Sequence, residues 1–325
     1  MTCFDASRTR LYGLLHVTAD KASHANLRPG SKDPADIYLL CSALCAASVA
    51  ASGGTFALIT NDSARLRGRC DALGIGIADL ELIQHRFKWP VPGGIAFHSA
   101  HFKLELIEAF GTGQFGDCAG LIDIDTVLRK PLDLPALTQD GLVVYDITDV
   151  EVASYGLARI RHDLEVVAGR PLRDPRWYGG EFLMGTAAGF AILSEQIRKC
   201  WPNYLKAVGG LNHVGDEMIV STAINLAVEA GLPLINADRA GGVARWWTAR
   251  TNAPIPTFQK IANRSLLHLP ADKEFLAGFP RNAFDSSRFV AAYRKYAARK
   301  LLLRRIVNVV SQRLGGQRGF VAQLD

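Results

Sequence analysis

Export features are missing from the start of this sequence. The chain opens with MTCFDASR, which is not the basic stretch followed by a long apolar run that a secretory signal needs. We therefore expect the protein to stay in the cytoplasm.

Cysteine is scarce and scattered. The six cysteines form no CxxC pair, and their spacing is typical of neither a zinc site nor a disulfide framework. Cys41 and Cys45 lie four residues apart in a predicted helix and so share one face, where we favour packing over metal binding or redox chemistry. We expect the cysteines to be reduced and mostly buried.

Internal repeats, low-complexity tracts and linkers rich in serine or proline are also missing. The chain has 325 residues, of which 49% are hydrophobic and 21% charged, as in a soluble globular protein with a sizeable core. We predict one α/β domain over residues 1–279, followed by a helical tail over residues 280–325.

Acidic residues are lacking at the C-terminal end. Residues 288–324 contain nine Lys or Arg and no Asp or Glu, which leaves 28 basic and 31 acidic residues in the rest of the chain. The net charge of +6 therefore belongs to the tail, and the body shows no basic excess that would bind nucleic acid. We expect no nucleic-acid partner.

Apolar runs and helical stretches alternate through the opening part of the chain, as in βα units around a largely parallel sheet. The predicted strands cover residues 11–17, 55–60, 80–85, 119–124 and 142–145, and the predicted helices cover 36–51, 65–73 and 99–110. Gly53 and Gly54 end the first helix, and residues 61–63 cap the second. The pattern predicts an α/β fold with a mostly parallel central sheet and flanking helices.

Two aspartates stand at the end of the fourth predicted strand. Carboxylates that leave water need cations or hydrogen bonds. Asp123 and Asp125 can point to one side because alternate strand residues share a face, and their oxygens suit Mn²⁺ or Mg²⁺, with a diphosphate completing the coordination shell. The alternative is that one aspartate caps a turn while the other makes a surface ion pair.

This segment and its surroundings resemble the GT-A glycosyltransferases, particularly glycosyltransferase family 8 and its bacterial relatives. As in that family, the helix 101–108 precedes the DxD strand, and an apolar stretch with Pro131 and Leu132 follows it. Residues 177–185, 215–224 and 265–273 resemble later family segments in the expected order. The usual Asn of the first of these segments is absent, as are the glycine and the Lys-Pro-Trp ending of the last. The resemblance implies a GT-A (Rossmann-like) fold that transfers a sugar from a nucleotide-diphosphate donor, probably a UDP-sugar, to a glycan or lipid-linked acceptor.

The resemblance also implies roles for individual residues. The implied metal ligands are Asp123, Asp125 and His268, with Mn²⁺ or Mg²⁺ as cofactor. The resemblance and the ends of the predicted strands place the donor near Thr18, Asp20, Asn61, Asp62, Lys103, Asp123, Asp125 and Lys273. Capping and turn formation are the alternative for the first four, and an ordinary solvated helix lysine is the alternative for Lys103. The acceptor is expected near Gly179, Gly180 and Glu181, and near Trp246 and Trp247, unless these tryptophans anchor their loop to the body.

Glycosyl transfer leaves negative charge on a diphosphate while the sugar becomes oxocarbenium-like. A divalent ion stabilises the leaving group. Asp216 and Glu217 are the candidates for the base of an inverting enzyme or for the group that stabilises the positive sugar face in a retaining one. Capping of the following helix explains the same pair structurally.

The tail predicts a basic amphipathic helix over residues 287–314. Its apolar stripe consists of Phe289, Tyr293, Tyr296, Leu303, Val307, Val310 and Leu314, interleaved with arginines and lysines. Such a helix suits the surface of an anionic membrane and is too charged to span one. We therefore expect peripheral association with the inner face of the cell membrane; the alternative is a helix packed on the domain with its charges in solvent.

Three other classes remain open. Asp123 to Val127 also fits the D-x-D-x-T/V motif of haloacid-dehalogenase-type phosphatases, with Asp123 as nucleophile, although that nucleophile normally follows the first strand. A nucleotidyltransferase would carry a glycine-rich, basic loop after its first strand, which residues 16–23 do not form. A noncatalytic membrane adaptor on a transferase-like fold is the third class.

Overall fold

The computed structural model describes residues 9–18, 33–134, 140–149, 156–238, 241–249 and 256–313, with side chains as far as residue 307. Asp20, one of the predicted donor residues, lies outside the described residues.

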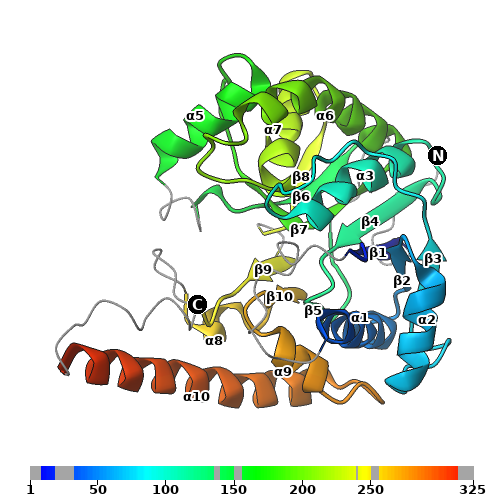
Figure 1. The fold of residues 1–325 in the computed structure, drawn as a ribbon, viewed down its shortest axis with the longest axis vertical. Coiled ribbons are helices and arrows are strands. Elements are labelled where there is room, and N and C mark those ends of the chain that lie inside the picture. The colour runs from blue at the N-terminus through cyan, green and yellow to red at the C-terminus, as the bar shows by residue number, and fades with distance from the viewer. Residues whose placement is uncertain are drawn as a thin grey trace.

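A seven-stranded sheet in the order β3-β2-β1-β4-β7-β6-β8 forms the centre of the molecule (Figure 1). Its strands are β1 (Arg10–Leu15), β2 (Phe56–Thr60), β3 (Glu81–Gln84), β4 (Cys118–Ile122), β6 (Leu142–Asp146), β7 (Tyr178–Thr186) and β8 (Leu234–Asn236). Each pairing in this sheet is parallel except those of β7, which runs antiparallel to β4 and β6. The predicted mostly parallel central sheet is therefore confirmed.

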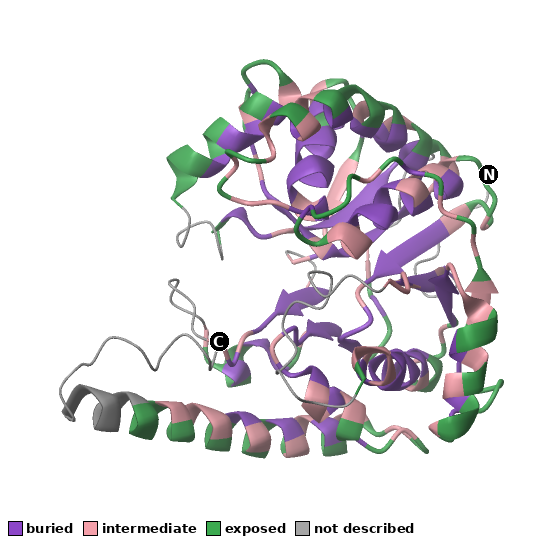
Figure 2. Ribbon diagram, viewed as in Figure 1, coloured by how far each residue is buried: buried purple, intermediate pink, exposed green. Residues whose placement is uncertain are grey.

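Helices cover both faces of this sheet, which is why β2 is buried along its whole length (Figures 1 and 2). One layer contains α3 (Lys103–Gly111), α5 (Leu157–Ala168), α6 (Ala187–Ala207) and α7 (Asp216–Glu229), with the short 3-10 helix η2 (His98–Phe102) leading into α3. The other face is covered by α1 (Pro34–Ala51) and α2 (Ser63–Ala72). The predicted helices in these regions are thus present, with ends shifted by up to four residues.

A second, three-stranded sheet lies below the main one, in the order β5-β10-β9. Its strands are β5 (Thr126–Leu128), β9 (Val243–Arg245) and β10 (Leu266–His268). β5 follows the Asp123–Asp125 turn directly and pairs antiparallel with β10, so that His268 stands opposite Thr126. This register brings a histidine from late in the chain beside the two aspartates.

The C-terminal helices α8 (Phe258–Ile261), α9 (Lys273–Gly278) and α10 (Ser286–Arg313) pack with α1 and the small sheet around a second apolar core. The first part of α10 belongs to this core, because Phe289 and Tyr293 are fully buried. Farther along, Leu303 and Val307 of the predicted apolar stripe are exposed (Figure 2). The predicted tail helix therefore has two parts, one packed on the body and one facing solvent.

Among the described residues, α1 is long and apolar enough to cross a membrane by length and composition. It packs against α9, β5 and β2, and more than half of its apolar window is buried. Cys41 and Cys45 lie on its buried face, and burial raises the pKa of both thiols. These features identify α1 as a core helix, with packing as the role of the two cysteines.

Candidate metal-binding and catalytic site

The two aspartates of the DxD segment lie in a turn, not within a strand. β4 ends at Ile122 and β5 begins at Thr126, so the predicted alternation along one strand is wrong as the reason for their proximity. The turn is held by three hydrogen bonds: Asp123 N donates to Glu181 O at 3.0 Å, Thr126 Oγ1 to Asp123 O at 2.7 Å, and Leu269 N to Asp125 O at 3.1 Å. The closed turn places both carboxylates at the carboxyl edge of the main sheet.

Each aspartate is held at one oxygen by a lysine. Lys103 Nζ lies 2.6 Å from Asp123 Oδ1, and Lys273 Nζ lies 2.6 Å from Asp125 Oδ2. The remaining oxygens face the imidazole of His268, whose Nε2 is 3.7 Å from Asp123 Oδ2 and 3.2 Å from Asp125 Oδ1. The lysines thus orient one oxygen of each carboxylate toward the same nitrogen.

The charges of this cluster stabilise one another. Burial alone would lower the pKa of His268, but the carboxylates of Asp125 and Glu181 outweigh it and raise that pKa to about 9. Burial would raise the pKa of Asp125, yet Lys273 and His268 hold it well below its usual range. At neutral pH Asp125 is therefore ionised and His268 is protonated when no metal is bound.

These groups fit a divalent cation. Asp123, Asp125 and His268 each offer one ligand atom, and the three atoms lie within 4.8 Å of one another. Two carboxylates and one imidazole suit Mn²⁺, and the carboxylates also suit Mg²⁺. Asp125 and His268 are buried while Asp123 is partly open, so the site has an approach from solvent on the Asp123 side.

A second ion pair supports the histidine from behind. Glu181 is fully buried, and its Oε1 lies 3.4 Å from His268 Nδ1. Arg245 donates through Nε to Glu181 Oε1 at 2.8 Å, and its Nη2 bridges Glu181 and Glu217. The order Glu181, His268, cation site matches the carboxylate–histidine arrangement that fixes the ring of a metal-binding histidine.

Asp216 and Glu217 begin α7 and face this cluster. Neither makes a side-chain cap on the helix, whose N-cap is Gly215. Asp216 Oδ2 lies 2.9 Å from Lys103 Nζ, and Glu217 Oε1 accepts from Gly180 N at 3.1 Å. The structure therefore gives the pair a place beside the DxD turn and not the capping role that was its alternative.

The glycines before Glu181 allow the charged side chains to approach the backbone. A Cβ at Gly180 would lie 2.8 Å from Asp216 Oδ2, and a Cβ at Gly179 would collide with the Glu181 carboxylate. Lys103 also donates to Gly180 O at 2.9 Å. Gly179, Gly180 and Glu181 thus form a wall of the charge cluster, and Glu181 has no exposed surface for the acceptor contact predicted for it.

The predicted donor residues divide into two groups. Lys103, Asp123, Asp125 and Lys273 are brought together, with Lys273 buried behind Asp125 and donating also to Pro270 O. Asn61 bonds both backbone groups of Val17, and Asp62 caps α2 by accepting from Arg65 N. Thr18 follows Val17 at the same strand end. Asn61 and Asp62 therefore have structural roles that account for them.

Trp246 packs away from the site. It is buried in the second core against Phe258 and Tyr293, and its Nε1 donates to Pro256 O at 2.9 Å. This burial leaves no ring face for a sugar and gives no support to the predicted stacking on the acceptor. The neighbouring Trp247 is half-buried, in the loop after β9.

Arg245 is the central residue that sequence reasoning left out of the site. It lies on β9 and reaches the cluster because β9 pairs in parallel with β10, which places Arg245 next to His268. Its guanidinium bonds Glu181 and Glu217. The pairing of the small sheet, which the sequence does not signal, decides this role.

The fold and the cluster together define a class. The mostly parallel sheet with one antiparallel strand, and the acidic turn at its carboxyl edge, match the GT-A type fold of a solved glycosyltransferase. A solved structure of galactosyltransferase LgtC with donor and acceptor sugar analogues matches 87% of this chain and 100% of its own, with 13% identity and a TM-score of 0.50. The bifunctional glycosyltransferase WbbM matches 82% of this chain and 46% of its own, with 11% identity and a TM-score of 0.46. Mouse xyloside xylosyltransferase 1 matches 80% of this chain and 97% of its own, with 11% identity and a TM-score of 0.45. No protein-family model and no curated protein sequence matches the chain. The predicted GT-A resemblance is confirmed for the fold.

Proposed function

We propose that the protein is a divalent-metal-dependent glycosyltransferase that moves a sugar from a nucleotide-diphosphate donor, a UDP-sugar, to a glycan or lipid-linked acceptor. The observation that carries this proposal is the alignment of Asp123 Oδ2 and Asp125 Oδ1 on His268 Nε2 at the carboxyl edge of a GT-A sheet. Ligands of α/β sheets gather at this edge. The phosphatase alternative has little support, because β1, β2 and β3 all precede the strand that leads to Asp123.

The residues of the cluster have separable roles in this reaction. Asp123, Asp125 and His268 would hold Mn²⁺ or Mg²⁺, which when bound supplies Lewis-acid stabilisation of the departing diphosphate. Lys103 and Lys273 keep the carboxylates oriented, which preorganises the site at no cost during the reaction. Asp216 and Glu217 lie beside the turn, where a carboxylate can accept the acceptor proton or stabilise a positive sugar.

A donor-hydrolysis assay tests the proposal. The full-length protein is incubated with Mn²⁺ and a panel of nucleotide sugars, and release of nucleoside diphosphate is followed. We expect hydrolysis of at least one donor, lost in Asp125→Asn and kept in Asp71→Asn, because Asp71 is an exposed aspartate on α2 away from the site. Release of phosphate from simple phosphomonoesters, without donor hydrolysis, would favour the phosphatase.

We also propose that the exposed part of α10 binds an anionic membrane surface, which would place the enzyme at the inner face of the membrane. Leu302, Leu303, Ile306 and Val307 are all exposed, and the spacing of four residues puts them on two adjacent stripes of the helix. The chain around them, residues 288–324, carries nine basic residues and no acidic one. An apolar stripe flanked by cations suits an anionic lipid interface.

Flotation with liposomes tests membrane binding. Cutting the chain before α10 would remove Phe289 and Tyr293 from the second core, so substitution is the cleaner change. We expect Leu302→Ser/Ile306→Ser to lose binding to vesicles that contain phosphatidylglycerol, with the wild-type protein bound and Val166→Ser, an exposed apolar position on α5, unaffected. Equal flotation of the double variant and the wild type would count against the proposal.

A further inference from the structure

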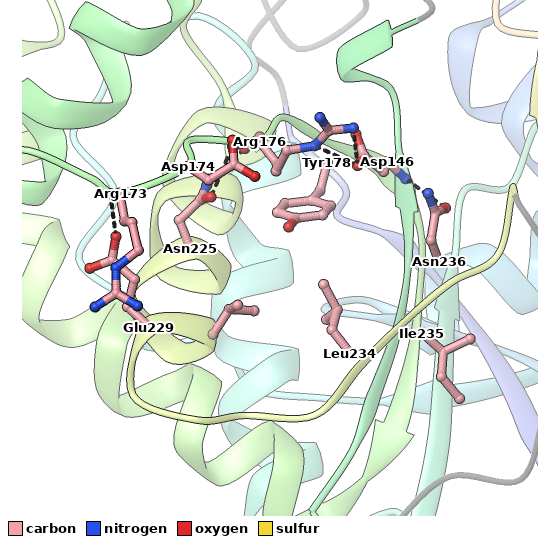
Figure 3. A pocket seen from close by; sticks show the side chains of 11 residues that line it. Asp146, Arg173, Asp174, Arg176, Tyr178, Asn225, Glu229, Leu234, Ile235 and Asn236 are labelled. Carbon is pink, nitrogen blue, oxygen red and sulfur yellow. Dashed lines mark hydrogen bonds and ion pairs between the residues drawn. The ribbon is translucent and has the colours of Figure 1, made fainter.

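A cavity of about 670 Å³ lies beside the edge strand β8, bounded by β6, the start of β7 and the C-terminal half of α7 (Figure 3). Its volume is within the range of about 300–1,000 Å³ that is usual for small-molecule sites. None of the described residues that line it belongs to the Asp123–Asp125–His268 cluster. The cavity is therefore a separate feature that the proposed chemistry leaves unexplained.

The walls of the cavity mix charges of both signs. Arg173 and Arg176 line it together with Asp146, Asp174 and Glu229, so neither sign predominates strongly. The guanidinium of Arg176 is already paired with Asp146 at 2.7 Å. The three acids outnumber the two arginines, which disfavours a phosphate, whereas a neutral polyhydroxylated molecule needs donors and acceptors side by side.

Tyr178 supplies an unpaired hydroxyl to this cavity. Its side chain is 5% exposed, and Figure 3 shows the ring among the lining side chains with its hydroxyl directed into the cavity. The hydrogen bonds of Tyr178 within the described chain are made by its backbone with Ser221 Oγ, and its Oη has no partner there. This hydroxyl can donate to or accept from a hydroxyl of a ligand, while the ring contacts the C–H face of a sugar.

The polar wall is fixed independently of any ligand. Asn225 holds the backbone of Arg176 from both sides, with Arg176 N donating to Oδ1 at 2.9 Å and Nδ2 donating to Arg176 O at 2.7 Å. Asp146 binds the guanidinium of the same residue and accepts from Thr148 N at 2.9 Å. A wall that is already ordered loses little conformational entropy on binding, which favours recognition of small, flexible ligands.

The cavity and the catalytic cluster share strand β7. Tyr178 of the cavity wall precedes Gly180 by two residues, and the backbone of Gly180 contacts Lys103 and Glu217. We propose that this cavity is a subsite for a neutral saccharide unit of the acceptor, an inference that rests on the proposed function. The subsite would hold a sugar next to the one that receives the new bond.

Saturation-transfer NMR on the full-length protein tests the subsite. The probes are lactose, maltose, cellobiose and N,N′-diacetylchitobiose, used without donor or metal. Val228→Trp fills the cavity from an exposed wall position, and Val166→Trp is its matched control because both valines are 39% exposed, on α7 and α5 respectively. Tyr178→Phe removes the unpaired hydroxyl alone.

We expect transfer to at least one disaccharide in the wild type, in Val166→Trp and in Asp125→Asn. Transfer should be lost in Val228→Trp, and the affinity should fall about 2- to 10-fold in Tyr178→Phe, as for loss of one hydrogen bond. No transfer in the wild type, or transfer that survives both cavity variants, would overturn the subsite. Because the assay needs no donor, its failure is distinguishable from failure of the transferase proposal, which the donor-hydrolysis assay measures.

Discussion

Two buried carboxylate sites in this molecule have opposite characters. Asp272 is fully buried, and its two oxygens accept from Thr248 Oγ1 at 2.7 and 2.8 Å, from Tyr293 Oη at 2.7 Å and from Lys300 Nζ at 2.6 Å. One acid meets three donors from two segments of the chain, the loop after β9 and α10, which saturates its lone pairs. The site links α9, α10 and the loop after β9, and its arrangement is that of a structural hydrogen-bond network.

The DxD cluster is arranged the other way. Asp123, Asp125, Glu181, Asp216 and Glu217 meet two lysines, an arginine and a histidine, and one oxygen each of Asp123 and Asp125 is directed at the imidazole and not at a lysine. When the imidazole is neutral, its Nε2 and these two oxygens are three acceptors with no donor among them, which suits a cation. The difference between the sites lies in the ratio and direction of donors, since both are buried and both are charged.

Removing the Asp272 carboxylate should cause the largest effect, because Lys300, Tyr293 and Thr248 all lose their shared partner. We expect Asp272→Ala to lower the free energy of unfolding by about 3 kcal/mol or more, measured by urea denaturation. Asp71→Ala, an exposed aspartate, should change it by less than about 0.5 kcal/mol. If Asp272→Ala lowered the free energy of unfolding no more than Asp71→Ala, the Asp272 network would not stabilise the fold.

Metal addition should separate the two sites. At a concentration 100 times its Kd, Mn²⁺ should stabilise the wild type by about 2.7 kcal/mol, seen as a higher Tm that EDTA reverses. Asp125→Asn should abolish this rise because it removes a charged ligand, whereas Asp272→Asn should keep it despite a lower starting Tm. A rise in Tm that persists in Asp125→Asn would place the metal elsewhere.

The sequence allowed us to predict the main sheet and part of the DxD cluster, but not the Asp272 site. Asp123, Asp125 and His268 were foreseeable from a motif, and the main sheet from alternating apolar and helical patterns. The sequence did not allow us to predict three further roles: Glu181 beside His268, Arg245 between Glu181 and Glu217, and Asp272 in its hydrogen-bond network. These roles depend on the pairing of three-residue strands and on the packing of α10. Strands that short carry too little periodicity to be recognised.

A substitution of Glu181 tests whether the carboxylate next to His268 Nδ1 increases the affinity of the site for a cation. Glu181→Gln keeps the shape of the side chain but removes the charge that faces His268 Nδ1 and pairs with Arg245. We expect Mn²⁺ affinity, measured by electron paramagnetic resonance, to fall about 10- to 100-fold. Glu108→Gln, which breaks a surface pair between Glu108 on α3 and Arg198 on α6, is the matched control and should leave the Mn²⁺ affinity unchanged.

His16 is a partly buried histidine whose pKa, unlike that of His268, is not raised by carboxylates. Burial and the neighbouring His98 lower the pKa of His16 to about 4, whereas carboxylates raise that of His268. A base with a depressed folded pKa contributes stability that is complete above the unfolded value near 6.5 and is lost as pH falls toward 4. We expect this to cost about 1–2 kcal/mol across that window, allowing for partial exposure. Urea denaturation of the wild type and His16→Gln at pH 7 and pH 4.5 measures it, and an equal loss in both proteins would show that His16 does not contribute.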